Sequence, residues 1–159
     1  MRSIIAALLC IIMLNACKED PLATMPAFDI LLQDSATIFN TANIPEGKRS
    51  VIVRFDAHCG DCQKETDSLL MNMDKLKDVN FYFVTTEPFS QVNEFRDFYE
   101  MQKYPNITIG KDIKKFTPQH YKSPRTPLLA VYDKNKRLVK IYDGKPEIEI
   151  ILKQINDLQ

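Results

Sequence analysis

The sequence predicts an α/β domain in which a central β-sheet has helices on both faces. Three strongly apolar runs have the length and composition of buried strands, namely 50–55, 79–86 and 128–132. Apolar residues at helical spacing follow the first two runs, and another such pattern closes the chain. Because strands and helices that alternate in this way pack as layers, a sheet covered by helices is expected.

The first half of the chain opens with an expected β-hairpin. Residues 28–32 are predicted to form a short strand, and residues 36–39 are its expected partner. Residues 43–48 have the composition of a turn. The buried strand 50–55 comes next, and the helix after it is expected to run to about Lys77. Its apolar stripe consists of Cys62, Thr66, Leu69, Met73 and Leu76.

The second half continues the alternation of strands and helices. After strand 79–86, Ser90 is the expected N-cap of a helix that ends before Pro105. Residues 107–110 are expected to be extended, and 111–123 to hold one helical turn and a loop. The remaining expected elements are strand 128–132, turn 133–136, strand 137–142 and a helix with Pro146 in its first turn.

Composition restricts the function classes. The chain of 159 residues is 45% hydrophobic and 26% charged, which suits one compact domain. Its 21 basic and 21 acidic residues balance, so no basic surface attracts nucleic acid. We therefore predict no nucleic-acid partner, and we expect a monomer.

The N-terminus has the features of a targeting segment. Arg2 precedes an apolar run from Ile4 to Leu14 that is too short to span a bilayer. The run ends in Leu14-Asn15-Ala16-Cys17, which resembles the lipobox of bacterial lipoproteins. That resemblance implies a signal peptide over 1–16, lipidation of Cys17, and a tether over 17–26 before a domain at 27–159. The alternative is an ordinary secretory signal that is cut nearby.

Two cysteines, Cys59 and Cys62, stand where the strand 50–55 gives way to a helix. The N–H groups and dipole at a helix start stabilise a thiolate, which is the reactive form of cysteine. Cys62 lies on the apolar stripe and is expected to point inward, so Cys59 is the expected attacking thiol. A disulfide between them closes almost no loop and gains little stability. We therefore interpret the pair as reactive rather than structural.

The pair and the order of elements resemble the thioredoxin-like superfamily, in particular membrane-anchored thiol–disulfide oxidoreductases of the TlpA type. A second similarity is Thr126-Pro127, directly before the strand 128–132. The resemblance implies a thioredoxin-like fold with an N-terminal β-hairpin extension. It also implies a cis Pro127 that faces the cysteines, with Thr126 presenting its backbone to a substrate strand.

The sequence departs from this family at three places near the cysteines. His58 stands where relatives usually have Trp, and it is a candidate substrate-binding residue. Gly60-Asp61 replaces a spacer that typically contains Pro. Val53 stands where some relatives keep a buried carboxylate, which leaves Asp56 as the only acid expected close to the cysteines.

The predicted function is therefore thiol–disulfide exchange outside the cytoplasm. Cys59 attacks a substrate disulfide and Cys62 resolves the mixed disulfide, with no cofactor and no metal. The resemblance favours a reductant that is lipid-anchored in the cell envelope, facing the periplasm or exposed at the surface. Its expected partners are protein disulfides or dithiols and a membrane thiol–disulfide electron donor. The alternatives are a copper-binding chaperone, for which His120 is the candidate third ligand, and a non-catalytic binding module.

Overall fold

The computed structural model describes residues 20–157. Its strands form one seven-stranded mixed sheet with the order β2-β1-β5-β4-β3-β6-β7. The strands are β1 (Asp29–Leu32), β2 (Ile38–Asn40), β3 (Arg49–Arg54), β4 (Val79–Thr85), β5 (Ile107–Lys111), β6 (Leu128–Tyr132) and β7 (Leu138–Asp143). The helices are α2 (Gly60–Met71), α3 (Met73–Leu76), α4 (Phe89–Phe98), α5 (Phe116–His120) and α6 (Ile148–Asn156). The predicted α/β class is confirmed.

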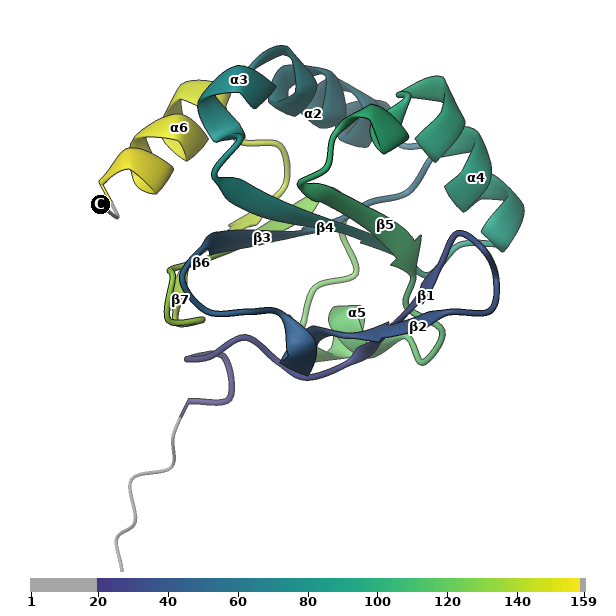
Figure 1. Cartoon of the computed structure of the whole chain (residues 1–159), viewed down its shortest axis with the longest axis horizontal. Coiled ribbons are helices and arrows are strands. Elements are labelled where there is room, and N and C mark those ends of the chain that lie inside the picture. Colours follow the sequence, from purple (N-terminus) through teal and green to yellow (C-terminus); the bar gives the residue numbers. More distant parts are fainter. Residues whose placement is uncertain (1–19, 158–159) are drawn as a thin grey trace, which may run out of the picture.

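The helices form a layer on each side of the sheet (Figure 1). Helices α2, α3, α4 and α6 cover one face, and the short α5 lies against the other. Strand β3 serves both layers because successive side chains of a strand point to opposite faces. Val51 and Val53 belong to the core beneath α2, whereas Ile52 belongs to the core on the α5 side.

The N-terminal hairpin is part of the sheet rather than an appendage. Strand β1 pairs with β2 and also with β5, both antiparallel. The backbones of strands β1 and β5 approach closely at Gly110, since a Cβ added to this residue would stand 2.5 Å from the carbonyl oxygen of Leu31. A residue with a side chain would clash at this position, so glycine is required there.

Several element boundaries differ from the expected ones. The helix after the cysteines breaks at Asn72, which ends α2 and begins α3. The expected Ser90 cap is wrong, because α4 begins at Phe89 with Pro88 in the N-cap position and no side-chain cap. The last helix begins at Ile148, so Pro146 precedes it rather than lying in its first turn.

The segment before β1 contacts the domain. Thr24 forms an isolated antiparallel bridge with Arg137, and the N–H of Met25 donates to the carbonyl of Lys136 at 2.8 Å. Thr24 and Met25, which belong to the segment expected as a tether, are thereby held on the domain. Cys17 and the expected signal peptide lie outside the described residues, and within residues 20–157 no helix is both long and apolar enough to cross a membrane.

Candidate active site

The start of α2 brings the two cysteines together. Cys59 is the N-cap residue, and its sulfur accepts a hydrogen bond from the backbone N–H of Cys62 at 3.4 Å. Cys62 lies inside the helix and is 1% exposed, whereas Cys59 is partly exposed. Both are free thiols. The predicted difference in exposure is confirmed.

The loop before β6 lies beside Cys59 although it is remote in the sequence. The Cys59 thiol donates to the carbonyl of Thr126 at 3.5 Å, and the Thr126–Pro127 peptide bond is cis, as the resemblance implied. The Pro127 carbonyl in turn accepts from the N–H of Gly144 at 2.9 Å. The expected neighbourhood of cysteine pair and proline is therefore present.

The two thiols differ in acidity. Partial burial acts to raise the pKa of Cys59, but hydrogen bonds from the thiol and backbone N–H of Cys62 outweigh it, so this pKa lies below its ordinary value. Burial raises the pKa of Cys62 to about 12. Cys59 is consequently the thiol that ionises first and is available for nucleophilic attack.

Asp56 and His58 form the turn that leads into the cysteines. The Asp56 carboxylate accepts from the backbone N–H of His58 at 2.8 Å, and the carbonyl of Asp56 accepts from the N–H of Cys59 at 3.1 Å. The side chain of His58 is exposed. Asp56 thus stabilises the turn through its backbone and side-chain contacts.

Glu65 is an acid of the site that the sequence analysis missed. It lies one helical turn after Cys62, is 1% exposed, and neither carboxylate oxygen has a hydrogen-bond partner among the described residues. Burial raises the pKa of Glu65 to about 7, with opposing influences from Lys145 and Glu147. The expectation that Asp56 is the only nearby acid is therefore wrong. The available signal was a glutamate on the apolar face of the cysteine helix.

Arg54 is a second missed residue. Its position in a buried strand places the guanidinium on the α5 side, where it is 3% exposed and donates to the backbone carbonyls of Ser123 and Arg125. Asp143 adds a counter-charge and accepts from the Ser123 hydroxyl at 2.9 Å. Arg54 thereby holds the loop that presents Thr126 to Cys59. A charged residue inside an apolar strand was the signal in the sequence.

His120, the candidate third ligand of the copper-binding alternative, does not form a metal-binding group with the cysteines. Across residues 20–157 no group of three or more His, Cys, Asp and Glu side chains has an arrangement that holds a metal ion. His120 instead stacks on Phe116, with ring centroids 5.1 Å apart, and meets Tyr121 edge to face at 4.9 Å. Burial lowers its pKa. Its surroundings are those of a packed aromatic residue.

Comparison with known proteins defines the fold. No protein-family profile matches this sequence, and neither does any curated protein. Solved structures do match, and three of them illustrate the range. A secreted disulfide oxidoreductase from Mycobacterium tuberculosis, homologous to E. coli DsbE, has a TM-score of 0.69 and 18% identity over 88% of this chain and 99% of its own.

The other two likenesses are of similar extent. A protein from Chlorobium tepidum assigned as a thiol:disulfide interchange protein DsbE has a TM-score of 0.70 and 18% identity, covering 87% of this chain and 97% of its own. Arabidopsis thaliana ScoI, solved with copper bound, has a TM-score of 0.63 and 19% identity over 85% and 99%. These likenesses, together with the observed sheet, show that the fold is thioredoxin-like.

Proposed function

We propose that this chain is a thiol–disulfide oxidoreductase in which Cys59 is the nucleophile and Cys62 the resolving thiol. The observation that carries the proposal is the asymmetry of the pair. Cys59 is partly exposed, accepts an N–H at a helix start and has a lowered pKa, whereas Cys62 is buried with a pKa of about 12. Thr126 and Pro127 beside Cys59 are the proposed backbone contact for the substrate, and exposed His58, which immediately precedes Cys59, is a further proposed contact.

The reaction proceeds by two exchanges of sulfur partners. The Cys59 thiolate attacks one sulfur of a substrate disulfide, that S–S bond breaks, and the departing sulfur takes a proton. Cys62 then loses its proton and attacks the Cys59 sulfur, which releases the second substrate thiol. Two electrons and two protons pass from the dithiol to the substrate. An external dithiol donor restores the reduced pair.

Glu65 is the proposed proton acceptor for the resolving step. The Cys62 thiol must lose its proton inside a buried environment, where its high pKa opposes ionisation. Glu65 follows on the same buried helix face, and a pKa of about 7 allows its carboxyl group to exchange a proton near neutral pH.

We further propose that the protein acts as a reductant and is held in the cell envelope by a lipid at Cys17. The lipobox-like sequence supports the anchor, and similarity to a secreted oxidoreductase supports a location outside the cytoplasm. In this proposal a membrane thiol–disulfide protein supplies electrons, and a monomer passes them to protein disulfides.

The redox equilibrium of the Cys59–Cys62 pair against glutathione tests the function. The protein used is the full chain in detergent with Cys10→Ser and Cys17→Ser, so that Cys59 and Cys62 are the only thiols that remain. A potential near that of thioredoxin, about −270 mV, supports a reductant, whereas one near −120 mV identifies an oxidant. A pair that forms no reversible disulfide refutes the oxidoreductase proposal.

A further inference from the structure

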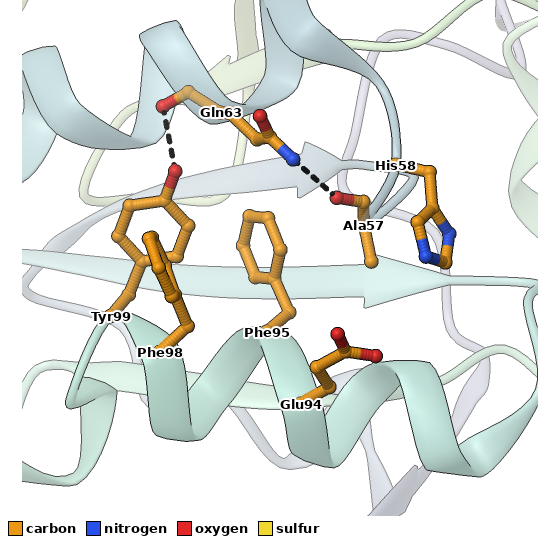
Figure 2. A pocket seen from close by; sticks show the side chains of 7 residues that line it. All are labelled: Ala57, His58, Gln63, Glu94, Phe95, Phe98 and Tyr99. Atoms are coloured by element: carbon orange, nitrogen blue, oxygen red, sulfur yellow. Dashed lines mark hydrogen bonds between the residues drawn. The ribbon is translucent and has the colours of Figure 1, made fainter.

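A pocket of about 200 Å³ lies beside the cysteine turn, between the start of α2 and helix α4. Figure 2 shows the side chains around it, with Phe95 between the aromatic rings at one end and Glu94 and His58 at the other. Ala57 and His58, which line it, immediately precede Cys59 in the chain. A side chain close to a cysteine bound at Cys59 is therefore within reach of the pocket.

The aromatic walls of the pocket are held in place. Phe95 is 3% exposed and stacks on Phe55 with centroids 4.5 Å apart. Tyr99 packs on Phe95 at 4.7 Å, and its hydroxyl donates to the carbonyl of Gln63 at 3.2 Å. The side-chain amide of Gln63 donates in turn to the carbonyl of Ala57 at 2.9 Å (Figure 2). The pocket is thus preformed.

Phe98 adds an apolar surface that the fold itself leaves uncovered. Its side chain is 76% exposed, and its ring meets the edge of Tyr99 with centroids 4.9 Å apart. A phenylalanine this exposed at the rim of a preformed pocket offers contact area to an incoming chain.

Glu94 is the acidic residue that lines the pocket, and His58 lies at the same end. Glu94 is exposed, and no ion pair to it exists within residues 20–157. Two basic residues of α2 and α4 already have acidic partners, since Lys64 pairs with Asp61 at 3.8 Å and Arg96 with Asp97 at 2.6 Å. Within residues 20–157 the Glu94 carboxylate thus has no ion-pair partner, and a cation of a bound chain can supply one.

We propose, building on the oxidoreductase function, that this pocket binds a lysine or arginine side chain of a polypeptide substrate, close to the cysteine under attack. The apolar stem of such a side chain packs on Phe95 and Phe98, and its cation pairs with Glu94 at the other end of the pocket. An acidic side chain is repelled by the Glu94 carboxylate. The pocket thus selects substrates whose target cysteine has a basic neighbour.

Matched peptide disulfides test this selection. The full chain in detergent, with Cys10→Ser and Cys17→Ser, reduces peptides that differ in a single residue near the cysteine, either arginine, norleucine or glutamate, with dithiothreitol as the electron source. The arginine is moved through the positions on both sides of the cysteine. At the best position kcat/KM is expected to fall in the order arginine, norleucine, glutamate.

Variants of the pocket separate charge from apolar contact. Glu94→Gln is expected to reduce the preference for arginine over norleucine about three- to fivefold, and Glu94→Lys to favour the glutamate peptide. Phe98→Ala is expected to lower kcat/KM for arginine and norleucine peptides alike. Glu46→Gln, which removes an exposed charge in the turn before β3, is the matched control and leaves the preference unchanged.

The outcomes distinguish this inference from the function on which it rests. Equal kcat/KM values for all peptides, or a preference for arginine that survives Glu94→Gln and Glu94→Lys, overturn the pocket proposal while the oxidoreductase stands. Failure to reduce any peptide, together with an irreversible Cys59–Cys62 pair, overturns both. Loss of the preference in Glu94→Gln, with the Glu46→Gln control unaffected, supports it.

Discussion

Replacing Glu65 by glutamine is expected to change how the stability of the protein depends on pH. The Glu65 carboxyl is 1% exposed, and burial raises its pKa from 4.5 to about 7. At about 1.4 kcal/mol per pKa unit, ionised Glu65 costs the folded state about 3 kcal/mol. Below pH 4.5 the carboxyl is protonated in the folded and the unfolded chain, so the penalty is absent. Above pH 7 it is ionised in both, so the penalty is complete.

The assay is urea unfolding of the wild type and Glu65→Gln over a range of about pH 4 to 8.5. This range begins about half a unit below the unfolded pKa and ends more than one unit above the folded pKa. Because the chain has no Trp and six Tyr, tyrosine fluorescence or circular dichroism follows the transition. The free energy of unfolding of the wild type is expected to fall relative to that of Glu65→Gln as the pH rises through this range. The difference should grow by about 3 kcal/mol.

Exposed Glu46 supplies the control for a change of one acidic charge. Glu46→Gln should give a stability curve parallel to that of the wild type at every pH. If Glu65→Gln also gives a parallel curve, Glu65 does not titrate between the two pKa values, and its proposed role as proton acceptor is lost with it.

Two further predictions concern Arg54 and the thiols. Arg54→Met leaves the buried carbonyl of Ser123 and the part-buried carbonyl of Arg125 without their donor, so urea unfolding should show a loss of about 2–4 kcal/mol. Stability within about 0.5 kcal/mol of the wild type would contradict this expectation. In the reduced protein with Cys10→Ser and Cys17→Ser, the ultraviolet absorbance of the thiolate should show a first step below pH 9 that belongs to Cys59 and a second near pH 12 from Cys62. Cys62→Ser should keep the first step and Cys59→Ser should remove it; the opposite result would reverse the assigned roles.

Arg54 gives the site a support that the sequence pattern near the cysteines does not reveal. Burial lowers its pKa, and Asp143 opposes that effect by adding a negative charge nearby. Because a guanidinium presents several donors in a fixed plane, it contacts two carbonyls of one loop at the same time. The position of Thr126 next to Cys59 thus depends on Arg54 of β3. Among the described residues, Arg54 forms no hydrogen bond with either cysteine sulfur.

The features that could be predicted from the sequence are those that depend on patterns among neighbouring residues. The strands around 50–55, 79–86 and 128–132 were readable because apolar runs of strand length are a property of neighbouring residues. The inward position of Cys62 followed from helical spacing alone. The approach of Thr126 to Cys59, 67 residues away, came from resemblance rather than from spacing.

Only the tertiary structure decided which polar residues are buried and what they contact. A glutamate three residues after Cys62 fits a helix whether or not other segments cover it. The charged groups that act on Glu65, Lys145 and Glu147, lie far along the chain. The partners of Arg54 lie about 70 positions further along the chain, and strand β1 pairs with β5 across a similar separation. Burial and ionisation are set by these distant contacts, because the free energy of a charge depends on what surrounds it in space.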